Sequence, residues 1–476
     1  MTDGLDRRDA AIFDAIEGMV TGQVSRGDFV KRAAALGLSA SAVGGILVAA
    51  GKASAADQVA ARAFAGTTVN LLIAQEGDDK GVHDKVAEIK KRFGIDLKYT
   101  ALGVGPLIEK ANQNLKAPTS SFDGIMVLGF TVAQMVGGGF FEPLNSYVKK
   151  APAGFDFPRD FPAGELEYVG YFDTKKGTFG GKTLYLIPGL HGGSVVLFYR
   201  KDLLRAAGLK PPTSWAQYLS HAEKLNTGGV AGNSMIAKSG DVSMFLVDWF
   251  TRFINQPGAR LMSGSPQAKN YAPRLTSPQS VAALDHMVKC VAFASSGVSS
   301  YDFTISADAF SAGKTAMMLL WSTIGGPVYS PKSSKVASKV SVAVPPGGGK
   351  AVRGGWGMGI PKNAKNKDAA WTVISYLTSK EWEKYQTLKY QTDPTRNSTF
   401  FDAKLAKALP YLPVAGKVFQ KAQILQIANI PETFELIGAA AEEFAAALSG
   451  SSSAAEACKK ANDRWIGVLK KAGHLK

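Results

Sequence analysis

Short apolar runs alternate with helical stretches along this chain, and that alternation constrains its fold more than any other feature. In the first third, the expected elements are strand 67–74, helix 82–93, strand 96–100, helix 108–115, strand 122–128 and helix 132–137. Such an order predicts an α/β fold built on a parallel, doubly wound sheet. Ligands of these sheets bind beyond the carboxyl ends of the strands. The loops 75–81, 129–131 and 189–194 are therefore the first candidates for a site.

The chain is too long for a single small core. Residues 56–476 are expected to form two lobes. Further along, strand 195–199 is followed by a helix that opens at Lys201, a Pro-Pro turn and a second helix capped by Thr213 or Ser214. A Pro/Gly-rich loop then separates strand 340–344 from the segment 354–360.

The first 55 residues have the composition of an export signal. Basic residues precede an uncharged run, 33–50, and the small residues 53–55 suit a signal peptidase. The stretch 25–31 resembles a twin-arginine signal, but Gly27 stands where that signal has its second arginine, so the general secretory route stays open. A membrane anchor is the alternative. The run is rich in Ala, Gly and Ser and only weakly apolar, which favours cleavage.

The cysteines and the net charge indicate which compartment and which partners to expect. Neither Cys290 nor Cys458 lies near the cleavage site, so no lipid anchor is expected and the mature protein should be soluble in the periplasm. That compartment permits a disulfide between them, which the sequence leaves open. The net charge of +16 survives cleavage, because the signal segment has equal numbers of acidic and basic residues. The lysines are dispersed and no nucleic-acid motif accompanies them, so a solvated surface and no nucleic-acid partner are expected.

Several passages carry a resemblance to a known family. Residues 181–226 form one, and four more follow one another in order: 122–144, which ends in GGGFFEPL, 310–321 (FSAGKTAM…W), 354–381 (GGWGMGIP and a helix) and 391–400 (QTDPTRNSTF). They resemble the family 1 extracellular solute-binding proteins of ABC importers, the sugar-binding group that includes the maltose-binding proteins. The match covers nearly all of 66–476.

This resemblance implies a two-lobed periplasmic-binding-protein fold, in which each lobe is a doubly wound sheet flanked by helices and the ligand cleft lies between the lobes. The implied boundaries are lobe 1 at 56–188, lobe 2 at 189–345, a return to lobe 1 at 346–398 and C-terminal helices of lobe 2 at 399–476. The implied function is capture of a sugar or polyol by lobe closure. The expected partner is a membrane permease, and the protein is expected to be a monomer without a cofactor.

Aromatic residues are the first ligand-binding candidates, since sugars offer C–H faces to planar rings and hydroxyls to polar side chains. Trp321 and Trp356 stand where the resembled family often has stacking aromatics. Phe130 follows the third strand, where the maltose-binding members have a polar ligand contact, which suggests a different substrate. Packing alone accounts for each of the three as well.

Polar candidates come from the loops and from the last matching passage. Gln75, Glu76 and Asp79 belong to a loop similar to the first ligand-contacting loop of the maltose-binding members, although an aspartate there also suits helix capping. The remaining candidates are His191 and Ser194 near the predicted lobe junction, Asp241 before an apolar helix, and Arg396 in the P-x-R sequence. For these four, surface exposure, capping or bracing of the crossing are the alternatives.

Enzyme motifs do not emerge from the sequence. The Gly313-Lys314-Thr315 sequence lacks the earlier glycine of a phosphate loop, no serine lies in G-x-S-x-G, and the five histidines have no metal spacing. No catalytic residue, metal or cofactor is therefore expected. The main hypothesis is a transport receptor for a sugar or polyol. A receptor for an anionic sugar or organic acid is the rival, since the positive charge and Arg396 would tolerate one, and an exported carbohydrate-active enzyme with a carboxylate pair is the third.

Overall fold

The structure is a computed structural model, and it describes residues 24–36, 64–75, 78–152 and 154–476. The chain falls into two compact units. The smaller comprises Met1–Val69 and Asp84–Lys98, and the larger comprises Asn70–His83 and Tyr99–Lys476. Among the described residues, no helix is both long and apolar enough to cross a membrane.

The smaller unit includes helix α2 (Arg26–Ala35) and most of helix α4 (Asp78–Phe93). Ser25 caps α2, because its hydroxyl accepts a hydrogen bond from the backbone N–H of Asp28 at 3.2 Å. The twin-arginine-like stretch thus lies mainly on a capped helix. Most of the uncharged run and the predicted cleavage site lie outside the described residues.

The larger of the two main sheets has five strands. Its strands run in the order β2-β1-β3-β12-β6 and are β1 (Thr68–Ala74), β2 (Asp96–Leu102), β3 (Gly124–Leu128), β6 (Ile187–Gly193) and β12 (Gly354–Gly359). Strands β1 and β3 are parallel, whereas β12 is antiparallel to both β3 and β6. Strands β3, β12 and β6, which lie next to one another in that order at one side of the sheet, are buried almost throughout.

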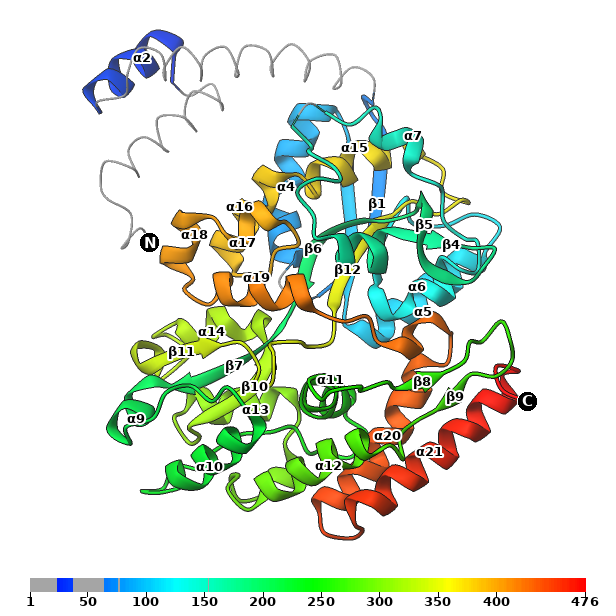
Figure 1. Ribbon diagram of the computed structural model, residues 1–476. Helices are drawn as coiled ribbons and strands as arrows, with labels where there is room; N and C mark the ends of the chain where they lie inside the picture. The colour runs from blue at the N-terminus through cyan, green and yellow to red at the C-terminus, as the bar shows by residue number, and fades with distance from the viewer. Residues whose placement is uncertain (1–23, 37–63, 76–77, 153) are drawn as a thin grey trace. The chain divides into compact units, whose positions relative to one another are not determined.

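A second sheet has three strands. Its order is β10-β7-β11, and it consists of β7 (Val195–Arg200), β10 (Met317–Trp321) and β11 (Val340–Ala343), all antiparallel. The chain passes from the five-stranded sheet to this one at Ser194, between β6 and β7, and returns between β11 and β12 (Figure 1).

Helices pack around the sheets of the larger unit. The longer ones are α5 (Val104–Lys116), α10 (Trp215–Leu225), α12 (Pro278–Val291), α15 (Lys367–Leu377), α16 (Lys380–Tyr390), α19 (Leu412–Lys421), α20 (Thr433–Leu448) and α21 (Ala454–Lys471). Helices α20 and α21 lie side by side at the end of the chain (Figure 1). Trp465 of α21 donates its indole N–H to the carbonyl of Leu436 at 2.6 Å, and its ring lies 5.9 Å from that of Phe245. This aromatic core fixes the C-terminal pair against the preceding helices.

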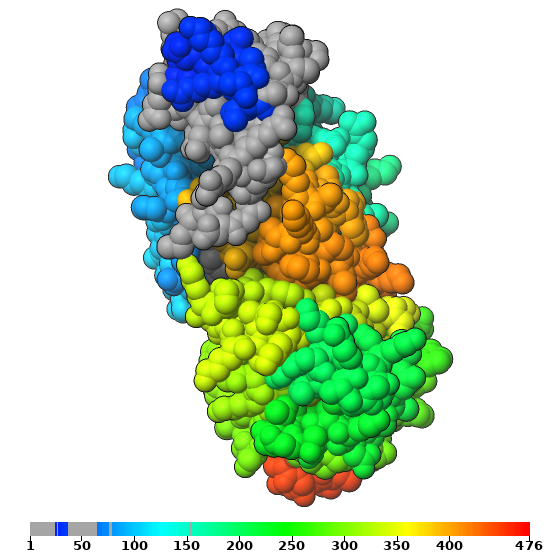
Figure 2. Space-filling model, turned by 90° about the vertical axis from the view of Figure 1, so that its left-hand side faces the viewer, coloured from blue at the N-terminus to red at the C-terminus, as the bar shows by residue number. Residues whose placement is uncertain are grey.

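One short helix connects the region of the second sheet to the segment after α16. Helix α14 (Gly325–Tyr329) follows β10, and its Tyr329 ring stacks on Tyr411, just before α19, with centroids 6.0 Å apart. In Figure 2 the residues of α14 and β11, in yellow-green, adjoin those of α16–α19, in orange, on one face. Helix α17 (Asn397–Phe400) and helix α18 (Ala403–Ala408) complete that orange group.

The α/β class is confirmed, but three local predictions are wrong. The five-stranded sheet is mixed rather than parallel, since β12 returns antiparallel beside β3, and the three-stranded sheet is antiparallel. Helix α4 begins at Asp78, four residues before the predicted start, because the polar residues after β1 form its first turn. The stretch 189–194 is mostly strand β6, not a loop. Its glycines permit close backbone approach: a Cβ on Gly192 would lie 2.1 Å from the carbonyl oxygen of Pro394.

Cys290 and Cys458 are separate buried thiols. Cys290 lies on α12 with its sulfur 3.7 Å from His286 Nδ1, and Cys458 lies on α21 with its sulfur 3.7 Å from the hydroxyl of Ser280. Burial raises the pKa of the Cys290 thiol to about 11 and that of Cys458 to about 12. The two groups therefore act as small core side chains.

Candidate ligand-binding site

A cavity of about 480 Å³ opens where the ends of the two sheets meet within the larger unit. It is lined by Val104, Leu128, Phe130, His191, Gly192, Gly193, Val242, Ser243, Leu246, Phe303, Trp321, Thr323, Ile324, Pro327, Gly354, Gly355, Trp356 and Phe434. The volume falls in the ordinary range of small-molecule sites. The lining comes from segments far apart in the sequence, so the fold assembles it.

One wall of the cavity belongs to the five-stranded sheet. Trp356 of β12, Phe130 after β3 and His191 of β6 are only 3%, 6% and 7% exposed. The Phe130 ring packs edge-on against Tyr168 at 6.0 Å and against Phe434 at 6.2 Å. The side chains of this wall are thus nearly fully buried.

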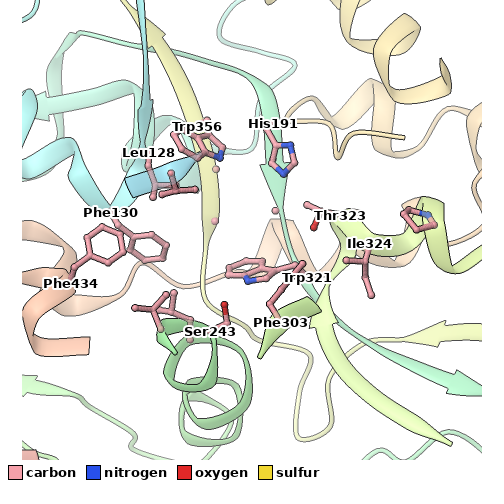
Figure 3. A pocket seen from close by; sticks show the side chains of 18 residues that line it. Leu128, Phe130, His191, Ser243, Phe303, Trp321, Thr323, Ile324, Trp356 and Phe434 are labelled. Carbon is pink, nitrogen blue, oxygen red and sulfur yellow. The ribbon is translucent and has the colours of Figure 1, made fainter. Parts of the chain in front are cut away.

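The other wall belongs to the three-stranded sheet and its neighbours. Trp321, at the end of β10, is partly exposed and reaches into the middle of the cavity (Figure 3). Glycine makes that position possible, since a Cβ on Gly354 would lie 2.9 Å from the Trp321 ring. Partly exposed Phe303 and Ser243 lie beside Trp321 on the side away from Trp356.

The chemistry of the lining is aromatic and neutral. Five of the described lining residues are Phe or Trp, and the polar side chains among them belong to His191, Ser243 and Thr323. None of these described lining residues carries a carboxylate, ammonium or guanidinium group. Ring faces suit C–H surfaces, and hydroxyls and imidazole suit hydroxyl groups of a ligand. Across the described residues, no cluster of three or more His, Cys, Asp or Glu side chains could hold a metal ion.

Four of the predicted site residues come together in this cavity: Phe130, His191, Trp321 and Trp356. Gln75 is exposed at the end of β1 and outside the lining, and its backbone N–H donates to the carbonyl of Leu102. Asp79 lies in the first turn of α4, where capping was the alternative. Glu76 lies outside the described residues.

The other three predicted residues make structural bonds instead of lining the cavity. Ser194 donates to the carbonyl of Ala415 at 3.0 Å, and Asp241 accepts from the backbone N–H of Ser243 at 2.8 Å. Arg396 is fully buried, with its guanidinium 4.2 Å from the centre of the Phe161 ring and 3.5 Å from Asp160. Arg396 therefore interacts with other residues of the protein and does not line the cavity.

A buried ion pair stands behind the five-stranded wall. Arg353 lies 3.4 Å from Glu165 and donates to the carbonyl of Ala422 at 2.9 Å. Gly355, with φ of +145°, lets the Glu165 carboxylate approach β12, because a Cβ there would lie 2.3 Å from its oxygen. Burial raises the pKa of Glu165 to about 7, against the opposing effect of Arg353.

Sequence reasoning missed Phe303, Phe434, Ser243 and Thr323. Thr323 stands two residues after Trp321, and Ser243 two residues after Asp241, so both neighbour residues that the sequence did single out. Phe303 is the first residue of the helix Phe303–Ser311 and Phe434 is the second residue of α20, and their sequence context looks like ordinary amphipathic packing. Only the tertiary fold brings them to the cavity.

Comparison with known proteins bears on what this cavity is for. Residues 74–384 match the model of the bacterial extracellular solute-binding proteins, and this span is well over half of the chain. The chain belongs to that family. The resemblance seen in its motifs is thereby confirmed, and membership places the protein among binding proteins rather than enzymes.

Individual relatives agree with the assignment. The chain is 26% identical over 410 residues to the mannitol-binding protein of Pseudomonas aeruginosa, covering 80% of this chain and 88% of that one. It is 25% identical over 359 residues to a protein of Sinorhizobium fredii named as a probable amino-acid ABC transporter periplasmic-binding protein, covering 74% and 78%. The structure of an ABC transporter solute-binding protein from Agrobacterium radiobacter K84 in complex with ribitol matches with a TM-score of 0.70 and 26% identity, covering 84% and 98%. The solute-binding-protein fold is therefore confirmed.

Proposed function

We propose that this protein is the substrate-binding component of an ABC importer and that it captures a neutral polyol or sugar. The observation that carries the proposal is the lining of the cavity, in which Trp321 and four other Phe or Trp rings surround a few neutral polar groups. A polyhydroxylated ligand would place its C–H surface on the rings and its hydroxyls on His191, Ser243 and Thr323.

The neutral lining favours a polyol or sugar over the ionic rivals. An anionic sugar or organic acid would need a cationic or N–H-rich partner, and an amino acid would need a carboxylate as well. Arg396, the cation that could have served an anion, is buried in its contacts with Asp160 and Phe161. The names of two relatives, a mannitol-binding protein and a ribitol complex, support the same class of ligand.

We infer that binding works by closure of two lobes, each containing one of the sheets, with boundaries near 56–188, 189–345, 346–398 and 399–476. The change of sheet at Ser194 and the return between β11 and β12 support crossings near these positions. A ligand held on Trp321 from one sheet and on Trp356 from the other would stabilise the closed arrangement, which a permease would then recognise.

We also propose that the protein acts as a monomer in the periplasm after removal of 1–55 by a signal peptidase. The charges and small residues of that segment support export, by a twin-arginine-like or a general secretory route. The dispersed lysines support a solvated surface without a nucleic-acid partner.

The test is a thermal-shift and calorimetric screen of the purified protein against D-mannitol, ribitol, other polyols, neutral sugars, sugar acids and amino acids. A ligand at about 100 times its Kd should add roughly 2.7 kcal/mol to the free energy of unfolding. We expect shifts with polyols or neutral sugars. Shifts confined to acids or amino acids would overturn the ligand class, and turnover of a bound glycan would overturn the receptor assignment.

A further inference from the structure

One buried carboxylate joins the two walls of the cavity. Asp393 lies in the segment between α16 and α17, within the passage that also contains the P-x-R sequence, and it is fully buried. It does not line the cavity. Both its carboxylate and its backbone carbonyl are bound to segments that do.

The carboxylate accepts a hydrogen bond from the wall that contains Trp321. The hydroxyl of Ser322 donates a short hydrogen bond to Asp393 Oδ2. Ser322 stands between the lining residues Trp321 and Thr323, and it also pairs with Ser194: its N–H donates to the Ser194 carbonyl at 2.6 Å, and its hydroxyl accepts from the Ser194 N–H at 3.2 Å. The turn that orients Trp321 is thus tied to Asp393 through one side-chain bond.

The backbone of Asp393 is hydrogen-bonded to the other wall, which contains His191. Its carbonyl accepts from the N–H of Gly192 at 2.9 Å, and Gly192 stands next to His191 in β6. The close approach of Gly192 to the Pro394 carbonyl leaves no room for a side chain there. One residue therefore connects the pocket ends of β6 and β10, which belong to different sheets.

We propose that Asp393 is a positioning residue for ligand binding, which sets the placement of Trp321 through Ser322 while its backbone holds the His191 segment. It touches no ligand itself. This inference rests on the proposed function of the cavity, and it adds a residue that acts on the site from behind.

The environment of Asp393 makes the link sensitive to pH. Burial raises the pKa of its carboxyl to about 6, while the hydrogen bond from Ser322 and the nearby His191 oppose the rise. Burial raises the pKa of Tyr411 and the nearby Asp393 adds to the rise; the Tyr411 hydroxyl donates to the carbonyl of Gln391 at 3.3 Å. The neighbouring Glu383 accepts hydrogen bonds from the backbone N–H and the hydroxyl of Thr395. Ionisation strengthens the acceptor for Ser322, so the turn should tighten as pH rises through 6.

The first experiment needs no ligand. The purified full-length protein is labelled with 5-fluorotryptophan, and the Trp321 fluorine resonance is assigned with Trp321→Phe and followed from pH 4.5 to 8. We expect this resonance to shift with a midpoint near pH 6 in the native protein, and to lose that shift in Asp393→Asn and in Ser322→Ala. Ser322→Ala leaves the carboxyl intact, so it keeps the test valid if Asp393→Asn does not fold.

Glu165→Gln is the matched control, because Glu165 is a second buried carboxyl whose pKa is raised into the same range and it has no bond to Ser322. The Trp321 shift should persist in that variant. A shift that survives in Ser322→Ala or Asp393→Asn, or that disappears in Glu165→Gln, would overturn the proposal.

The second experiment measures affinity for D-mannitol at pH 7.5 by calorimetry. Loss of the Ser322–Asp393 bond should raise Kd by about fivefold in both Ser322→Ala and Asp393→Asn, the usual effect of one hydrogen bond. Unchanged Kd in both variants would overturn the positioning role. If the native protein binds no polyol or sugar but the Trp321 shift behaves as expected, the proposed function fails while the control of Trp321 by Asp393 stands.

Discussion

The two walls of the cavity use the same residue types in different ways. On the five-stranded sheet, Trp356, Phe130 and His191 are nearly fully buried. On the three-stranded sheet, Trp321 is partly exposed, and so are its neighbours Phe303 and Ser243. One wall is a continuation of the protein core, and the other presents side chains to solvent.

Because of this difference in exposure, a substitution should have different effects on stability and on ligand binding in the two walls. A buried ring loses its contacts with the protein when it is truncated, whatever its part in binding. A partly exposed ring has already left much of its surface to water, so covering it with a ligand is a net gain. We therefore expect substitutions in the first wall to act mainly on folding and those in the second mainly on affinity.

The largest expected effect is that of Trp356→Ala. Trp356 is 3% exposed on β12, between β3 and β6, so its removal should lower the free energy of unfolding by about 3–5 kcal/mol. Urea unfolding followed by circular dichroism measures the loss. Trp321→Ala is the matched variant and should lose less than half as much. Equal losses in the two variants would erase the distinction between the walls.

The pH dependence of stability sharpens the same contrast, because a different buried carboxyl lies behind each wall, Glu165 behind the first and Asp393 at the turn of the second. The pKa of Glu165 rises from 4.5 to about 7 in the folded protein. The native state therefore keeps its proton where the unfolded chain has lost it, and stability falls as pH rises from 4.5 to 7. This contribution amounts to about 3 kcal/mol.

The measurement is urea unfolding of the native protein and Glu165→Gln at pH 4.5 to 8. As pH rises to 7, the variant should become more stable relative to the native protein. Above pH 7 the difference between their free energies of unfolding should stay constant. A difference that stays constant with pH would show that Glu165 is ionised throughout. Contributions from other groups cancel, since both proteins contain them.

Local patterns predicted the elements well where periodicity and apolar runs decide them. Strands β1, β3, β7 and β11 and the cap of α10 at Ser214 lie within one or two residues of their predicted places. The glycine-rich stretch 189–194 failed, because glycine is typical of loops yet here allows β6 to lie against Pro394. The contact that selects the strand is more than 200 residues away in sequence.

Apart from His191, the site was predictable only in its Phe and Trp residues. Trp321 and Trp356 follow or belong to apolar strands, so their types and positions sufficed. The charged candidate Arg396 was misleading, since a sequence does not reveal that Asp160 and Phe161 enclose it. Asp393, three residues earlier, drew no attention because its bond to Ser322 spans 71 residues.

Substitution of Trp321 is expected to lower the affinity for the ligand. Trp321→Ala should weaken binding of the ligand found in the screen by about 1–3 kcal/mol, as expected for an aromatic anchor. Trp321→Phe should recover part of this loss, because it keeps a ring of smaller area. Isothermal calorimetry gives both values. Native affinity in Trp321→Ala would remove the second wall from recognition and contradict the assignment of the anchor.

The smallest expected effect is that of Ser243→Ala. Ser243 is partly exposed and lines the cavity, so its hydroxyl can reach a ligand. Losing one neutral hydrogen bond should cost about 1 kcal/mol of binding free energy and nothing measurable in unfolding. Phe130→Leu is the counterpart in the first wall and should do the reverse, since its ring packs against Tyr168 and Phe434. If Ser243→Ala instead lowered stability while leaving Kd unchanged, its hydroxyl would belong to the protein's own bonding, and recognition on that wall would depend on the rings alone.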